Sequence, residues 1–337
     1  MRYKTKGSLV EMEQKVFDIK DDPMPKGTWW WWFWLFFIDN PKDPKKPRQL
    51  MILWSTKNNK KLSCNNQDIK FTNSKDRSAL DGVVAAWYYD GKKMHHNYLL
   101  EQCALNISKN RIATDSHPAT SFTITKNQST IKIGDEFEIT AKPIINHNFT
   151  KPIHNSHTYR LNKGYSIIKQ NHLTITGKHK NKPIHGTAYF QRVFVNAPAI
   201  PWYWGIFHFE NNSILTYINN YLLGKSFKKD ITYFDGTKIH EFTDITIKKS
   251  KETPPSFKIS GQNRHEKISF KVNSYSHSSW TFKKKAHKII PNKLVYNEYP
   301  ATISDMELID KKTGKNITPK DLGSSVGNAE HATGFLL

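Results

Sequence analysis

Short runs in which apolar and polar positions alternate recur along most of the chain. They are rich in Val, Ile, Thr, Phe, Tyr and Trp, and turns of Asn, Gly, Lys and Pro separate them. This pattern is typical of antiparallel β-strands that bury one face. Convincing amphipathic helices are almost absent. The sequence therefore predicts an all-β protein.

The strongest apolar run is Trp29–Ile38, which reads WWWWFWLFFI and contains five tryptophans. It is too short to cross a bilayer as a helix, which needs about 20 apolar residues. Its aromatic content favours a strand, whose odd and even positions point to opposite faces. Both faces are apolar, so both need cover. One would line a barrel or sandwich core, and the other would meet a second layer, a second domain or a large apolar ligand.

The length of 337 residues suggests two domains or one large β domain. Strand-like runs fill Trp29–Pro143 and resume at Ser166. The His- and Asn-rich stretch Ile145–Asn162 between them resembles a long loop or an interdomain linker. We therefore predict an N-terminal extension over 1–27, a first β domain over 28–160 and a second over 161–337.

The chain is strongly basic, with a formal net charge of +22. Arginine, the usual reader of phosphates and base edges, accounts for only seven of the 51 basic residues. We therefore expect no specific nucleic-acid partner. Weak contact with an anionic membrane surface fits the lysines better, since each contributes about 1 kcal/mol near such a surface. The N-terminus lacks an apolar signal core, so we expect a cytoplasmic protein, with peripheral membrane attachment left open.

The segment Gly186–Glu210 is the first candidate for chemistry. Two strand-like runs flank a loop with two prolines, and a hairpin between them would gather aromatic and polar side chains into one patch. Such a patch could hold an unsaturated ligand and deliver a proton, and tryptophan faces stabilise cations by about 2 kcal/mol when desolvated. This patch would comprise Tyr189, Gln191, Trp202, Trp204 and His208, with Glu210 at its end. The alternative is that His208 is a hydrogen-bonded core histidine.

A second candidate acid is Glu101, which alternation places on the apolar face of NYLLEQCALNI. Burial would raise its pKa and make it a general acid; otherwise it is simply solvated. We predict His208, Glu101 and Glu210 as catalytic candidates. The predicted ligand-binding residues are Trp29, Trp31, Trp32, Trp34, Trp87, Tyr189, Gln191, Trp202 and Trp204.

Motifs for nucleotides, metals and serine nucleophiles are missing. The chain has no GxGxxG, no Walker loop and no GxSxG elbow. Its histidine clusters, at 95–96 and at 147, 154 and 157, lack the spacing of known metal sites. We therefore predict neither a metal nor an organic cofactor.

The segment Lys178–Glu210 resembles a lipocalin-like family that contains the carotenoid 1,2-hydratases (hydroxyneurosporene synthases), the AttH-like proteins and, more distantly, the tocopherol cyclases. That family has a Gly-x-x-Tyr strand, a loop with proline and a Trp-x-Trp strand. The matching positions are Gly186, Tyr189, Pro201, Trp202 and Trp204. The tryptophan run is similar to the family's first strand. LVYNEYPATISDMEL and GNAEHATGF are similar to its last strands, with matches at Tyr296, Glu298, Gly327, Glu330 and Gly334.

This resemblance implies two consecutive lipocalin-like antiparallel β-barrel domains. It also implies chemistry in which an alkene is protonated and then hydrated or cyclised, often on a polyprenyl chain. One departure stands out. Many members carry an acidic–His–Asn–Trp–Gly run after the Gly-x-x-Tyr element, where this chain has Gln191, Arg192, Val193 and Phe194.

Three functions remain open from the sequence. The first is an enzyme of the hydratase or cyclase kind, acting on an apolar, isoprenoid-like molecule. The second is a non-catalytic lipid-binding or carrier protein with the same fold. The third is a structural or interaction protein whose basic loops contact an acidic partner.

Overall fold

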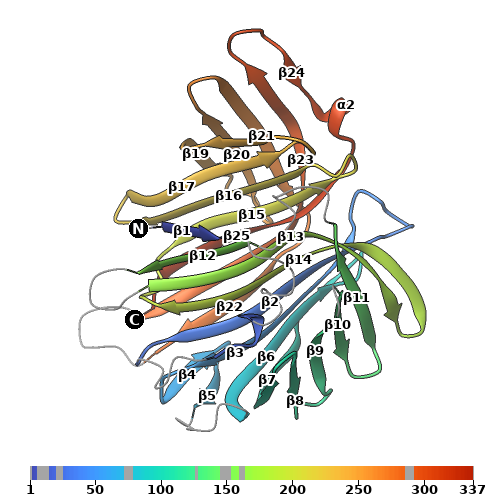
Figure 1. The fold of residues 1–337 in the computed structure, drawn as a ribbon, viewed down its shortest axis with the longest axis vertical. Helices are drawn as coiled ribbons and strands as arrows, with labels where there is room; N and C mark the ends of the chain where they lie inside the picture. Colours follow the sequence, from blue (N-terminus) through green and yellow to red (C-terminus); the bar gives the residue numbers. More distant parts are fainter. Residues whose placement is uncertain are drawn as a thin grey trace.

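The computed structural model describes residues 2–5, 15–19, 26–71, 79–125, 128–144, 153–158, 164–284 and 292–336. The protein is almost entirely β and forms two antiparallel sheets, drawn one above the other in Figure 1. The predicted fold class is confirmed. Among the helices of the described ranges, none is both long enough and apolar enough to span a membrane.

Ten strands of the first sheet close into a barrel. Around the ring, each strand pairs antiparallel with its neighbours. They are β2 (Trp29–Ile38), β3 (Arg48–Lys57), β6 (Ala79–Tyr89), β7 (Met94–Ser108), β8 (Arg111–Thr114), β9 (Thr120–Thr125), β10 (Gln128–Ile133), β11 (Phe137–Pro143), β13 (Gly164–His179) and β14 (Lys182–Asn196). The barrel is closed because β14 pairs with β2 on one side and with β13 on the other.

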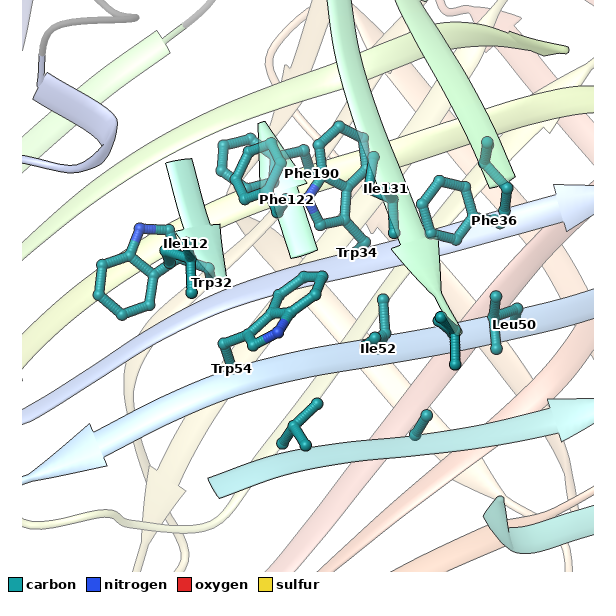
Figure 2. Packing of buried hydrophobic residues seen from close by; sticks show 14 of the residues in the cluster. Trp32, Trp34, Phe36, Leu50, Ile52, Trp54, Ile112, Phe122, Ile131 and Phe190 are labelled. Atoms are coloured by element: carbon teal, nitrogen blue, oxygen red, sulfur yellow. The ribbon is translucent and has the colours of Figure 1, made fainter. Parts of the chain in front are cut away.

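Strand β2 is buried on both faces, as its sequence predicts. Its even-numbered residues, from Trp30 to Ile38, pack inside the barrel against Trp54, Phe122 and Phe190 (Figure 2). Trp34 stacks on Phe36 with ring centroids 5.4 Å apart. The odd-numbered residues point outward to the second sheet. Aromatic side chains therefore fill the barrel interior, and a second domain covers the other face.

Two outlying segments extend or pack against this barrel. Strands β1 (Arg2–Thr5) and β12 (Ile153–Thr158) pair with each other, and β12 continues onto β13. Val16 and Phe17 pack into the barrel core, and the Trp32 indole donates to the carbonyl of Val16 at 2.7 Å. The predicted extension thus contributes to the core. Part of the stretch expected to be a loop is strand β12, and its other residues lie outside the described ranges.

The second sheet is built mainly from residues 202–335. Its main strands are β15 (Trp202–Phe209), β16 (Ile214–Leu222), β17 (Lys225–Phe234), β18 (Ile239–Phe242), β19 (Asp244–Lys249), β20 (Ser256–Gln262), β21 (Glu266–Ser274), β23 (Lys293–Asp310) and β25 (Ser325–Phe335). The sheet order begins at β18 and ends at β19, and only Thr243 separates these strands in the chain. The bent segment made of β18 and β19 therefore pairs with β17 through one part and with β20 through the other. It closes the second sheet around an apolar core of its own, and we call this closed sheet the second barrel.

Short elements complete the structure. A hairpin from the first half, β4 (Lys61–Cys64) and β5 (Gln67–Lys70), pairs with β22 (Ser278–Lys283) of the second sheet. Strand β24 (Asn316–Ile317) and helix α2 (Pro319–Leu322) follow β23. Strands β13 and β14 lie beyond residue 160 yet belong to the first barrel. The chain changes barrel between Asn196 and Trp202.

Candidate active site between the two barrels

The two barrels meet through their outer faces, and this interface is apolar and aromatic. The first barrel contributes the odd-numbered residues of β2 together with Trp87 of β6 and Tyr189 of β14. The second contributes alternate residues of β15, β22, β23 and β25, including Trp280. Several aromatic side chains here are only partly buried, among them Trp29, Trp31, Trp202, Trp204 and Tyr296.

Two glutamates lie side by side within this apolar interface. Glu298 of β23 and Glu330 of β25 are direct cross-strand partners. Glu298 is 0% exposed and Glu330 is 5% exposed. Like charges directly opposite each other in a sheet are unfavourable, and buried carboxylates need partners. The surroundings must therefore either neutralise this pair or hydrogen-bond it.

Three aromatic donors serve the two carboxyl groups. The Trp87 indole N–H donates to Glu298 Oε2 at 2.5 Å, across the interface between the barrels. The Trp202 N–H donates to Glu330 Oε2 at 2.8 Å. The Tyr296 hydroxyl lies between the acids, 2.6 Å from Glu330 Oε1 and 3.1 Å from Glu298 Oε1. Each carboxyl group is thus held in a fixed orientation by groups from both barrels or from neighbouring strands.

Burial raises the pKa of both carboxyl groups well above the usual range. For Glu298 desolvation is the largest cause, and the nearby Glu330 charge adds to it. Desolvation also raises the pKa of Glu330, while Tyr296 and Trp202 oppose the rise. The Trp280 indole also lowers the pKa of Glu298 by favouring its charged form. The geometry at Trp280 Nε1 is nevertheless outside the range of a hydrogen bond. Because each charge opposes the other, the two groups titrate as a pair that retains a proton more readily than a free carboxyl group.

Aromatic rings surround this pair. The Trp202 ring lies 5.5 Å from that of Tyr296, and the Trp204 ring lies 5.3 Å from that of Tyr189. Elsewhere in the same interface, Trp29 packs edge-on against Trp31 and Phe282, with centroids 5.7 and 5.5 Å away. The polar pair therefore sits in a largely indole-lined region, where the low dielectric strengthens every charge interaction.

The structure divides the predicted ligand-binding residues into two groups. Trp29, Trp31, Trp87, Tyr189, Trp202 and Trp204 all lie in the interface between the barrels. Gln191 is half-buried and accepts a hydrogen bond from Tyr189 at 3.0 Å. Trp32 and Trp34 lie instead inside the first barrel, on the opposite face of β2. They have no contact with the carboxyl pair.

The predicted hairpin over Gly186–Glu210 is wrong. Strand β14 pairs with β13 and β2, whereas β15 pairs with β16 and β25, because the loop between them crosses from one barrel to the other. The side chains nevertheless meet face to face across the interface. Thr187 and His208 are hydrogen-bonded, and the rings of Tyr189 and Trp204 are in contact.

His208 ties the barrels together through both ring nitrogens. Its Nε2 lies 2.7 Å from the carbonyl of Asn171 and must carry the proton. Its Nδ1 therefore accepts from the Thr187 hydroxyl at 2.7 Å. Burial, the first cause, and the neighbouring His172 hold the pKa of His208 well below its usual value. This is the geometry of the hydrogen-bonded core histidine that the sequence left as an alternative.

The other two catalytic candidates lie outside the interface. Glu101 is half-buried on the face that carries Leu99 and Cys103, inside the first barrel, and accepts from the His117 backbone N–H at 2.9 Å. Glu210 is exposed after the end of β15 and accepts from the Ser324 hydroxyl at 2.5 Å, which lowers its pKa. The structure brings neither of them to the carboxyl pair.

The carboxyl pair itself was not among the candidates predicted from the sequence. Tyr296, Glu298 and Glu330 were matched to the family's closing strands, but no role was assigned to them. The available signal was an acid that alternates with aromatic or apolar residues in a strand-like run, as in LVYNEYP. Only the pairing of β23 with β25 reveals that the two acids meet.

Two other features bound the chemistry. Within the described ranges, no three His, Cys, Asp or Glu residues are grouped so as to hold a metal ion. A separate polar pocket of about 380 Å³ opens where the β4–β5 hairpin meets β22. Its lining includes Ser279 and Thr281, which alternate with Trp280 and so face away from the interface between the barrels.

Comparison with known proteins relates the chain to others through its fold. The structure is similar to that of a putative AttH from Nitrosomonas europaea, with a TM-score of 0.56 and 11% identity over 93% of this chain and 94% of that one. It is less similar to kievitone hydratase from Nectria haematococca, with a TM-score of 0.45 and 11% identity over 92% and 89% of the two chains. No protein-family profile and no curated protein sequence matches the chain. The resemblance inferred from the sequence is thus confirmed as a shared AttH-like fold.

Proposed function

We propose that the protein binds an unsaturated apolar molecule, isoprenoid or similarly lipid-like, between its two barrels and protonates a C=C bond of that molecule. The observation that carries the proposal is the buried Glu298–Glu330 pair, joined through Tyr296 in an indole-lined interface. A general acid works best when its pKa lies near the working pH. Burial and mutual repulsion shift both carboxyl groups in that direction.

The reaction balances with these groups alone. The protonated carboxyl group of the pair gives its proton to one alkene carbon, and the π electrons form the new C–H bond. The other carbon becomes a cation. The carboxylate that remains is stabilised by the donors Trp87, Trp202 and Tyr296. Water then adds to the cation and returns a proton to the carboxylate, so the net change is addition of water. Capture by a second group of the same molecule would form a ring.

The aromatic lining supports a cationic intermediate. Indole faces attract cations most strongly where water is excluded, by about 2 kcal/mol or more. Trp202 and Trp204 approach from the second barrel, and Trp87 from the first. An isoprenoid suits this setting because protonation of its trisubstituted double bonds gives tertiary cations. The half-buried aromatic side chains also match a long apolar chain rather than a compact polar substrate.

A carrier that binds the same molecule without changing it is the second candidate. It is favoured by the complete burial of Glu298 and by the hydrogen bonds that already occupy both carboxyl groups. In a carrier the pair would fix the relative position of the two barrels and would not transfer a proton.

Deuterium labelling separates the two candidates. The purified protein is incubated in D₂O with linear polyprenyl lipids such as squalene, and the recovered lipid is analysed by mass spectrometry. An enzyme adds a C–D bond, and either Glu298→Gln or Glu330→Gln abolishes the label. Glu266→Gln is the matched control, because Glu266 is a buried acid that pairs with His240 away from the interface.

The other outcomes are equally clear. A carrier retains the lipid through purification, in wild type and variants alike, and adds no deuterium. If no form adds deuterium and native mass spectrometry finds no lipid bound to any form, both candidates fail. If the two glutamine variants label the lipid as well as wild type does, the carboxyl pair is not the acid.

A further inference from the structure

The turn between β16 and β17 projects from the second barrel as a two-stranded ribbon. The last β16 residue paired with β15 is Asn220, and β17 pairs with β18 only from Ile231 onward. Between these positions the two strands pair with no third strand, with Leu222 opposite Lys225, and the Tyr221 N–H still donates to the Pro201 carbonyl at 3.0 Å. Figure 1 shows this turn at the left edge, on the same side as the C-terminal end of β25.

Two large apolar side chains are displayed on this ribbon. Leu223 is 93% exposed and Phe227 is 65% exposed, and within the described ranges no other large hydrophobic residue is classed as exposed. A single exposed apolar residue needs no explanation, whereas larger exposed apolar patches mark interaction sites, and here both exposed residues lie on one projecting ribbon.

The backbone conformation at Leu223 is also unusual for a leucine. Its φ is +49°, and the next residue, Gly224, has φ +75°. A two-residue hairpin turn of this kind favours Asn-Gly, because a side chain branched beyond Cβ is unfavourable at positive φ. Leucine at this position neither eases the turn nor packs into a core. Its apolar side chain is therefore left in solvent.

Positive charge flanks the apolar tip. Lys225, Lys228 and Lys229 lie in the same ribbon, and the chain as a whole carries +22. Lys228 and Lys229 form ion pairs with Asp230 and Asp244, each at 3.9 Å, which offset part of this charge. Apolar side chains that project beyond a ring of lysines match the boundary between lipid tails and anionic headgroups.

We propose that the β16–β17 tip docks the protein on an anionic lipid bilayer, with Leu223 and Phe227 inserted at the level of the acyl chains. The ribbon begins beside the candidate site, because Asn220 is the cross-strand partner of Trp202, whose indole N–H holds Glu330. Docking there places the Trp202 end of the interface next to the bilayer. This membrane function does not depend on the chemistry at the carboxyl pair.

The test is flotation of the full chain with two kinds of vesicle, pure phosphatidylcholine and phosphatidylcholine mixed with phosphatidylglycerol. Wild type should float with the anionic vesicles and dissociate in high salt. Leu223→Asn, which keeps the turn geometry, and Phe227→Ser should each weaken partitioning by about tenfold. Lys225→Gln should weaken it by about fivefold. Lys312→Gln, at the far end of β23, is the matched control and should bind as wild type does.

Each alternative result overturns the proposal. Wild type that fails to float, or a Leu223→Asn/Phe227→Ser variant that floats as well as wild type, excludes docking through this tip. If sedimentation shows wild type as a dimer and that variant as a monomer, the tip is a contact between two copies of the chain. Alkene protonation is measured separately with detergent-dispersed lipid, so failure of docking leaves the proposed chemistry standing.

Discussion

Replacing Tyr296 with phenylalanine removes one hydroxyl that serves both buried carboxyl groups. That hydroxyl is 2.6 Å from Glu330 Oε1 and 3.1 Å from Glu298 Oε1. It has a single proton to donate, and its hydrogen bonds lower the pKa of both acids. In Tyr296→Phe the pair should therefore hold its proton to a higher pH than in wild type.

The magnitude follows from the kind of hydrogen bond that is lost. A bond to a charged acceptor contributes about 1.5–3 kcal/mol and a bond to a neutral one about 0.5–1.5 kcal/mol. The difference, about 1 kcal/mol, corresponds to a rise of roughly one pKa unit for the pair. Carboxyl groups whose folded pKa is raised stabilise the fold fully below the unfolded pKa, and this contribution is lost as pH rises through the folded pKa. The free energy of unfolding should therefore fall by about 1 kcal/mol more at about pH 9 than at about pH 5 in Tyr296→Phe.

Urea unfolding of both proteins at the two pH values measures this difference. Tyr189→Phe is the matched control, because its hydroxyl donates to the neutral Gln191 side chain at 3.0 Å. The control should lose the same free energy at both pH values. If Tyr296→Phe also shows no dependence on pH, the carboxyl groups do not share a proton through this hydroxyl, and our view of the site as a general acid fails.

Two further substitutions test the structure around the site. Trp34→Ala leaves a cavity inside the first barrel, where Trp34 is 0% exposed, and should cost about 3–5 kcal/mol; an unchanged midpoint of thermal unfolding would contradict the packing. The Lys57 ammonium lies 4.2 Å from the Trp29 ring centroid, and burial lowers the pKa of Lys57 to about 8. Because the folded protein then binds fewer protons than the unfolded chain, wild-type stability should rise by up to about 3 kcal/mol as pH increases from about 8 to 10.5. Lys57→Met should abolish that rise in urea unfolding, and equal slopes for the two proteins would refute it.

Alternation along a strand was the most dependable information in the sequence. Because successive side chains of a strand must point to opposite faces, the run Trp29–Ile38 predicted which tryptophans share a face, but only the structure shows which face lies inside the barrel. Burial on both faces followed from composition alone. The identity of the cover did not, because a second domain and a large ligand both satisfy an apolar face. The structure shows that the second barrel provides it.

The pairing of strands that are far apart in the chain limited what else could be predicted from the sequence. Two alternating runs joined by a short loop normally pair as a hairpin, yet β14 and β15 lie in different barrels. The side chains of these two strands still meet, as Tyr189 and Trp204 do. In a hairpin they would lie side by side on one sheet, whereas here they approach each other from the two barrels. The Glu298–Glu330 pair was beyond reach, because it depends on the register of β23 with β25. A single acid in a strand also does not reveal its surroundings, since Glu101 is half-buried and accepts from a backbone N–H, whereas Glu298 is fully buried opposite a second acid.

The β4–β5 hairpin reaches from the first half of the chain to the far side of β22. Without it, β22 would present a free row of backbone N–H and C=O groups, which invites other molecules to add as new strands. The first half of the protein therefore protects this edge of the second half from self-association. The same hairpin links the domains without a covalent bond. The second half expressed alone would therefore expose the edge of β22, through which copies could polymerise.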